Sequence, residues 1–315
     1  TTVFVPSTVQ LSMSRENSMR HHEPFAPGFI KWKERSARTA VGGRGASLST
    51  ITAAAREGSQ PPQLAFAHDL IGDQHVGNPA PDHRLGLARA LGVVAQKASV
   101  LRQPLLARRC KAEFERTVQL DPSNMPAREG LLQFYMIAPS VMGGSMEKAH
   151  EQAEAIFKIN RLRGHIARGT LANREKDLVV VEREYRAAWT EFPDSAPSAT
   201  SLAGFLANNR RADEALAVME KFVAKEKDNL TGLFWFGRVA TTAGKQLDRG
   251  EQALRRVLAS SALGVDGNPA PVAVNFRLGE LLAKKGDKAG ARQAYEAALR
   301  LNPSLEQVKK ALKEL

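Results

Sequence analysis

A stretch rich in histidine and aspartate carries the side chains best suited to chemistry. The segment HDLIGDQHVGNPAPDH holds six potential ligands of a divalent metal: His68, Asp69, Asp73, His75, Asp82 and His83. No helical or strand period places them on one face, and glycines and prolines interrupt the segment. Because the spacing fits no metal-site pattern, we expect a loop here and no metal.

Motifs for catalysis are missing from the sequence. The segment VGGRGAS (41–47) has the glycines of a phosphate loop, but no strand pattern precedes it and no Lys-Ser/Thr follows. G-x-S-x-G, H-E-x-x-H and C-x-x-C do not occur. The single cysteine, Cys110, falls at a small packing position, which favours a buried structural thiol. We expect no enzyme activity and no cofactor.

The clearest structural pattern lies near the C-terminus, in GDKAGARQAYEAALRLNP (286–303). Ala291, Tyr295 and Ala298 are spaced i, i+4, i+7, so they share one face of a helix. Small residues on either side of a ring predict a second helix packed close to this face. Gly286 can end the preceding helix in a left-handed conformation, and Pro303 ends this one. The stretch is therefore expected to be the second helix of a helical hairpin.

With the helix expected at 275–282, this hairpin makes a unit of about 34 residues. The unit reads L-G-x-x-L-x-x-x-G-D-x-x-x-A-x-x-x-Y-x-x-A-x-x-x-x-P from Leu278 to Pro303. In that register the chain resembles the tetratricopeptide repeat (TPR) family. The resemblance implies an all-α solenoid of helical hairpins, wound as a right-handed superhelix, in which neighbouring units share one core.

Weaker copies of the unit precede this one. The small, large and third positions of their second helices recur as Cys110, Phe114 and Thr117; Ala149, Ala153 and Ile156; Val181, Tyr185 and Ala188; Ala215, Met219 and Phe222; and Gly250, Leu254 and Val257. We predict a partial repeat over 83–123, an array of about five repeats over 124–303, and a C-terminal capping helix over 304–315. Residues 1–82 lack a sustained period and are expected to be a disordered or non-native extension.

Composition agrees with closely packed helices but does not identify the compartment. No run of about 18 apolar residues occurs, so no membrane span is expected. One cysteine excludes an intrachain disulfide, and no signal peptide is visible in this chain. The cytoplasm and a bacterial periplasm both stay open. The Gly143-Gly144 loop resembles that of bacterial TPR proteins, which favours a bacterial source. The sequence does not predict an oligomeric state.

The formal net charge of +12 bears on which class of partner the protein binds. Basic residues are scattered along the repeats and many have acidic neighbours, as in EREYRAAWTE (182–191). Nucleic-acid binding would require a basic stripe with exposed aromatic side chains. We therefore favour a protein or peptide partner, acidic in character, over nucleic acid. An assembly factor for secretion or the envelope would use the same scaffold in another compartment.

The TPR resemblance also implies where a partner would bind. In such arrays the first helices line a concave groove, and their outward positions contact an extended peptide or a helix. The expected partner-binding residues are Gln133, Asn173, Arg174, Asn208, Phe234, Arg238, Phe276 and Lys284, with Thr170, Thr242 and Glu280 at further outward positions.

Four of these residues suggest the chemistry of the ligand. Phe234 and Phe276 occupy the same repeat position, and we expect both rings to project toward the concave side. Arg238 and Lys284 follow them on their own helices, which would suit apolar side chains beside a carboxylate. Glu280 lies between Phe276 and Lys284 and would neutralise the lysine if the two paired.

One turn departs from the repeat. Between the two helices of the first full repeat, MIAPSVMGGSMEK (136–148) is about five residues longer than the family turn. Its methionines make it apolar, and Gly143-Gly144 allows a tight reversal. We expect this loop to pack over the edge of the repeat, with a binding surface as the alternative.

Overall fold

The computed structural model describes residues 80–99, 101–265 and 267–315 of the protein. Within these ranges the chain forms thirteen α-helices, one short 3-10 helix and no strand. The elements are α3 (Pro81–Lys97), α4 (Gln103–Leu120), α5 (Met125–Ile137), η1 (Ser140–Met142), α6 (Met146–Ile159), α7 (Arg161–Glu175), α8 (Leu178–Glu191), α9 (Ala196–Asn208), α10 (Ala212–Lys225), α11 (Leu230–Ala243), α12 (Leu247–Leu258), α13 (Pro271–Lys285), α14 (Lys288–Leu301) and α15 (Glu306–Lys313).

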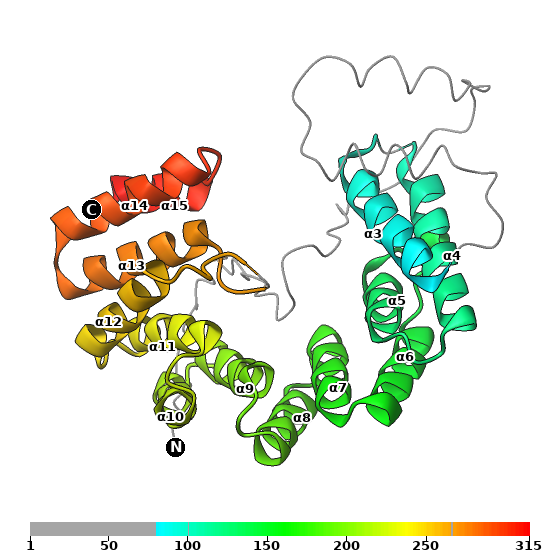
Figure 1. The fold of residues 1–315 in the computed structure, drawn as a ribbon, viewed down its shortest axis with the longest axis horizontal. Helices are drawn as coiled ribbons and strands as arrows, with labels where there is room; N and C mark the ends of the chain where they lie inside the picture. Colours follow the sequence, from blue (N-terminus) through cyan, green and yellow to red (C-terminus); the bar gives the residue numbers. More distant parts are fainter. Residues whose placement is uncertain (1–79, 100, 266) are drawn as a thin grey trace, which may run out of the picture.

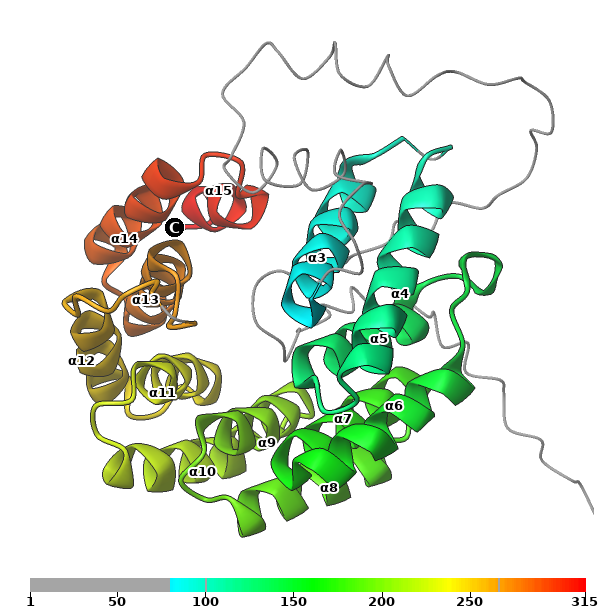
Figure 2. The ribbon, with the colours of Figure 1, turned by 45° about the vertical axis from the view of Figure 1, so that its right-hand side comes forward.

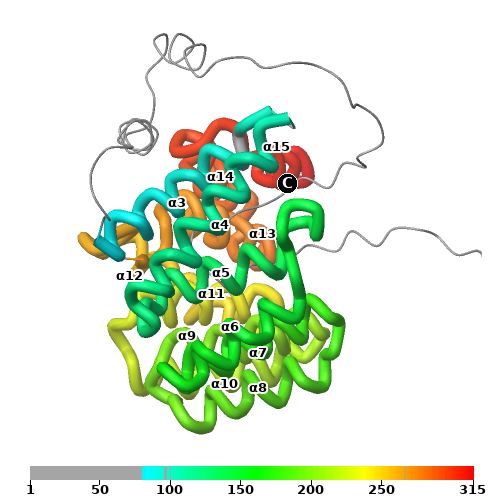
Figure 3. The backbone as a smooth tube through the Cα atoms, turned by 90° about the vertical axis from the view of Figure 1, so that its right-hand side faces the viewer, coloured from blue at the N-terminus to red at the C-terminus, as the bar shows by residue number. Residues whose placement is uncertain are grey.

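Consecutive helices pack as hairpins, and the hairpins stack into an arc (Figure 1). Helices α5, α7, α9, α11 and α13 lie on the inside of the arc, and α6, α8, α10, α12 and α14 lie outside, as Figure 2 also shows. In Figure 3 the ends of the array, α3–α4 and α14–α15, stand above its middle, α7 to α10. The all-α hairpin solenoid expected from the sequence is confirmed. We call the inside of the arc, formed by the five helices above, the concave face.

The hairpin of α13 and α14 shows why the repeat needs small residues. Ala291 and Ala298 are fully buried, and the Tyr295 ring lies between them. A Cβ added at Gly279 would lie 2.4 Å from the Tyr295 ring, so only glycine lets α13 approach it. Gly286 ends α13 with φ of 85°, in the left-handed region. These features agree with the sequence prediction.

Side-chain caps begin about half of the helices. Asn124, Asn160 and Asn229 each accept a hydrogen bond from the backbone N–H three residues later, and Asp177 and Asp287 do the same. Such caps satisfy backbone donors that the helix itself leaves free. Turns both between hairpins (Asn124, Asn160, Asn229) and within them (Asp177, Asp287) are therefore encoded locally.

The core runs through the array in two clusters of buried apolar side chains, one from Leu85 to Leu171 and the other from Ala172 to Val308. The two clusters meet on α7. At the C-terminal end, α15 buries Val308 and exposes Lys309, Lys310 and Lys313.

The first part of the expected domain division lies almost entirely outside the described residues. Of the extension predicted over 1–82, the structure describes residues 80–82, and α3 begins at Pro81. Helices α3 and α4 form the hairpin at 83–123 that the sequence assigned to a partial repeat.

Candidate functional site

Two of the six potential metal ligands, and the single cysteine, lie in the described part of the chain. His68, Asp69, Asp73 and His75 lie outside the described residues, whereas Asp82 and His83 lie in the first turn of α3. Across the described ranges, three or more histidine, cysteine or acidic side chains do not gather as metal ligands would. Cys110 is fully buried, and its Sγ–H donates to the Ala88 carbonyl oxygen at 3.2 Å, which agrees with a structural thiol. No helix in the described part is long and apolar enough to cross a membrane.

The residues predicted to bind a partner differ in exposure. Asn173, Arg174, Asn208 and Lys284 are exposed, and Gln133, Phe234 and Arg238 are half-buried. The side-chain carbonyl oxygen of Gln133 is buried without a hydrogen-bond partner in the described part of the chain. All of these residues lie on α5, α7, α9, α11 or α13, the helices of the concave face.

Phe276 does not project from the concave face as expected. Its side chain is 8% exposed, and its ring lies 6.0 Å from that of Tyr295 between centroids. The guanidinium of Arg277 covers it at 5.1 Å from the ring centroid. Thr170 is also buried, because its hydroxyl donates to the Ile166 carbonyl oxygen one turn earlier. The expected pair of exposed rings is therefore wrong, and Phe234 is the ring left at the surface.

Arg238 is held in an unusual environment. Its guanidinium lies over the ring of Trp235, 4.4 Å from the centroid. Trp235 in turn packs across to α9, where Gly204 leaves room for the indole ring. Among the described residues, the Arg238 side chain has no hydrogen-bond or ion-pair partner. Burial lowers the pKa of Arg238 to about 10, with a smaller contribution from the positive charge of Arg277, while Glu280 acts in the opposite direction.

Glu280 does not neutralise Lys284. Its carboxylate instead accepts a hydrogen bond from the Arg277 guanidinium at 2.6 Å, within α13. Lys284 lies beside Gly244, the residue that ends α11, and has no ion-pair partner in the described ranges. This end of the concave face carries three positive charges, on Arg238, Arg277 and Lys284, and one negative charge, on Glu280. It is therefore positive.

The neighbouring lining is almost uncharged. Helix α9 carries no acidic or basic residue, and Arg238 is the one charged residue of α11. Hydroxyl, amide and aromatic side chains dominate instead, among them Thr200, Asn208, Phe234 and Thr242. Within α9 and α11, Arg238 is therefore the one charged partner that a ligand carboxylate would find, and Lys284 lies on the neighbouring helix α13.

A histidine and two glutamates form a second cluster, which the sequence analysis missed. The Nδ1 atom of His165 lies 2.8 Å from Glu184, and Nε2 lies 3.3 Å from Glu191, so α7 and α8 are tied together. Both His165 and Glu184 are buried. Because both ring nitrogens already contact carboxylates, the imidazole has no free atom for a substrate, and the cluster is best explained as a structural contact. Only the separation of 19 and 26 residues hides it in the sequence.

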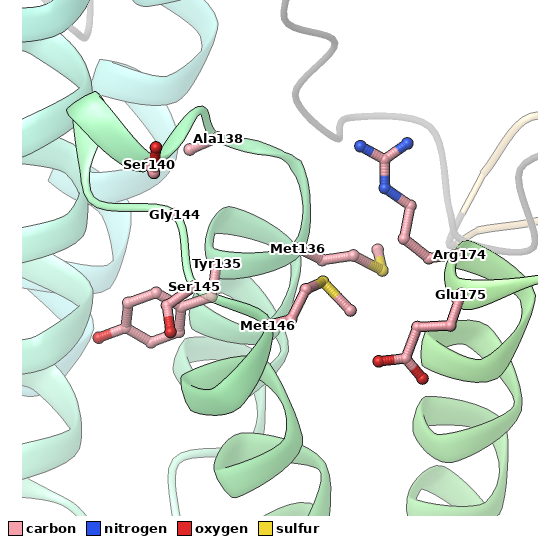
Figure 4. A pocket seen from close by; sticks show the side chains of 9 residues that line it. All are labelled: Tyr135, Met136, Ala138, Ser140, Gly144, Ser145, Met146, Arg174 and Glu175. Atoms are coloured by element: carbon pink, nitrogen blue, oxygen red, sulfur yellow. The ribbon is translucent and has the colours of Figure 1, made fainter.

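The long turn after α5 forms a pocket with α7. The pocket has a volume of about 540 Å³ and lies between residues of the loop, the start of α6 and the end of α7 (Figure 4). Arg174, one of the predicted groove residues, lines it together with Met136 and Met146. The loop itself is partly packed: Met136, Met142 and Met146 lie against the first core cluster, whereas Val141 is 76% exposed. Neither reading of the loop from sequence accounts for both facts.

One repeat of this chain matches a known family, and its fold is similar to that of solved structures. Residues 272–305 match the model of the tetratricopeptide repeat family. No curated protein matches the sequence.

Solved structures share the fold at low identity. The yeast Tom70 structure matches with a TM-score of 0.52 and 14% identity over 80% of this chain and 57% of that one. The APC/C hetero-tetramer Cut9–Hcn1 matches with a TM-score of 0.50 and 14% identity over 80% and 45%. A tetratricopeptide repeat protein from Parabacteroides merdae matches with a TM-score of 0.46 and 12% identity, over 80% of this chain and 96% of that one. This chain thus spans about half the length of the Tom70 and Cut9–Hcn1 chains, and the likeness concerns the fold.

Proposed function

Because this chain is a tetratricopeptide repeat protein in its matched unit and in its fold, we propose that it is a protein-interaction scaffold. The binding site is the part of the concave face formed by α9, α11 and α13. The ligand is a segment of a partner protein that carries apolar side chains beside a carboxylate.

The observation that carries this proposal is the state of Arg238. A half-buried guanidinium without a carboxylate partner in the described part of the chain costs free energy in the unbound protein. A ligand carboxylate that reached it would restore a charge-assisted hydrogen bond in a partly desolvated setting. Trp235 holds the guanidinium in place from one side, so little side-chain entropy would be lost on binding.

The surroundings of Arg238 define the rest of the ligand. Phe234 precedes Arg238 by one helical turn and is half-buried, so it offers part of its ring to an apolar side chain. The hydroxyl and amide groups of Thr242 and Asn208 can bond a peptide backbone. A basic ligand would meet Arg238 and Lys284, and is disfavoured by their charge.

Selection of random peptides against the full chain tests the proposal. Enriched peptides are synthesised with a fluorescent label, and their dissociation constants are measured by anisotropy at low and raised salt. We expect enrichment in aspartate or glutamate beside apolar residues, and weaker binding as salt increases. Arg238→Met should raise the dissociation constant about tenfold or more. The matched control is Arg292→Met, at an exposed arginine on the outer helix α14.

Two results would refute the proposal. Peptides enriched in lysine and arginine would show that the concave face does not select a carboxylate. Equal affinities of the selected acidic peptides for the wild type, Arg238→Met and an Arg238→Met/Phe234→Ala double variant would place binding elsewhere on the array.

A further inference from the structure

The pocket beside α7 differs from the rest of the surface in how it is built. One side of its lining comes from the end of α5, the long connection to α6 and the first residue of α6, and the other side is the C-terminal end of α7. The pocket is open to solvent and has a volume of about 540 Å³, enough room for a side chain of a ligand. The loop thus provides a binding wall that the regular repeats of this chain lack.

The loop is held firmly enough to form a wall. The backbone N–H of Gly144 donates to the Pro139 carbonyl oxygen at 3.2 Å, and that of Ser145 donates to the Tyr135 carbonyl oxygen at 2.9 Å. Gly143 has φ of 97°, which favours glycine, and a Cβ at Gly144 would lie 1.7 Å from the Ala138 carbonyl oxygen. The two glycines therefore fix one tight path for the chain.

The apolar lining comes mainly from two methionines. Figure 4 shows the thioether groups of Met136 and Met146 directed across the gap toward α7. Both side chains are half-buried, so each rests on the core while its end faces the pocket. Unbranched, polarisable side chains adapt to different apolar groups, which suits them to a recognition surface.

The charges at the rim are not equivalent. The carboxylate of Glu175 already has a hydrogen-bond partner, the Nε2 atom of His150, at 2.8 Å. Arg174, its neighbour on α7, is exposed and has no hydrogen-bond or ion-pair partner within the described ranges. In Figure 4 the two side chains turn in different directions from the end of α7. The free charge that this pocket presents to a ligand is therefore positive.

We infer that this pocket is a second peptide-docking site. An apolar side chain of a partner protein lies between Met136 and Met146, and the carboxylate of the residue next to it binds Arg174. Charge complementarity decides the occupant, because an acidic residue next to the apolar one satisfies Arg174 while Glu175 stays with His150. The site lies on α5, α6 and α7, whereas the site of the proposed function lies on α9, α11 and α13. The two proposed sites can therefore be tested independently, although this inference rests on the proposed function in assuming a protein partner.

Methyl NMR of the methionines in the full chain tests this inference. The methyl signals are assigned with the variants Met136→Leu and Met146→Leu. The probe is a panel of blocked hexapeptides that place leucine, methionine or phenylalanine beside aspartate or glutamate, each matched by a peptide with asparagine or glutamine instead. We expect the acidic peptides to shift the signals of Met136 and Met146 and the amide peptides to do so at least about fivefold more weakly.

Substitution of the charge separates the two sites. Arg174→Gln should weaken the response about tenfold, whereas Arg292→Gln and Arg238→Met should leave it unchanged. If the two methyl signals respond to no peptide of the panel at about 1 mM, or respond equally to acidic and amide peptides, the pocket is not a docking site for this ligand. An undiminished response in Arg174→Gln would also overturn the inference. None of these results depends on whether Arg238→Met weakens binding on the concave face.

Discussion

Replacing Arg238 by methionine should stabilise the protein while weakening its binding. In the folded chain the pKa of Arg238 falls from 12.5 to about 10, mainly because the guanidinium is buried. At any pH below about 10 the side chain is charged in both the folded and the unfolded chain, so the full free-energy cost of burying the charge opposes folding. Each pKa unit corresponds to about 1.4 kcal/mol, so this fall in the pKa of Arg238 corresponds to a cost of about 3 kcal/mol.

Part of this penalty is offset by contacts that methionine would not fully replace. The cation–π contact with Trp235, at 4.4 Å, contributes about 1 kcal/mol. The guanidinium also keeps some contact with water, which screens the remaining charge interactions. Methionine would keep apolar contact with the indole ring and remove the charge. We therefore expect the free energy of unfolding to rise by about 1–2 kcal/mol.

Urea unfolding followed by circular dichroism measures this change directly. Arg292→Met serves as the control, and its exposed position predicts an effect within about 0.5 kcal/mol. If Arg238→Met instead lowers the free energy of unfolding by about 1 kcal/mol or more, the guanidinium must stabilise the unbound fold. In that event its lack of a partner would no longer argue for a ligand carboxylate.

Three further predictions concern the packing and the charges of the array. Ala298→Trp should overpack the buried face of α14 and cost about 1–3 kcal/mol, and unchanged thermal unfolding would contradict this. The hydrogen bond from Arg161 lowers the pKa of Glu191 from 4.5 to about 2, so its stabilising effect is present above pH 4.5 and is lost as pH falls toward 2. The difference in unfolding free energy between wild type and Glu191→Gln should shrink in that window, and a difference constant with pH would refute the assignment. Burial raises the pKa of the Cys110 thiol to about 12, so a thiol-reactive dye should label it only on unfolding, and rapid labelling of the folded protein at neutral pH would disprove this.

The repeat architecture could be predicted from sequence because its determinants are local. Gly286, Asp287 and Asn302 act through backbone conformation and caps within a few residues of their own position. The spacing of Ala291 and Tyr295 sets a helical face that one neighbouring helix must cover. The same rules apply to each hairpin, so a clear unit at the end of the chain helped to identify weaker ones before it.

Side-chain partners on the concave face could not be predicted in the same way. Phe234 and Phe276 share a repeat position, yet Phe276 is buried against Tyr295 and Arg277. Repeat position specifies the direction of a side chain but not what the next helix places over it. Glu280 could meet Arg277 or Lys284 with nearly equal spacing along the helix, and the folded chain pairs it with Arg277.

The pocket and the histidine cluster required the tertiary structure altogether. Met136 and Arg174 are far apart in the chain, and they line one pocket because the hairpin of α5 and α6 stacks on α7. His165 meets Glu184 and Glu191 because α7 and α8 pack against each other within one hairpin. The sequence by itself determined the helices, their caps and the hairpin period, since each depends on neighbours along the chain. Which charges are paired and which are left free depends on distances between helices, and the stacking of hairpins decides those.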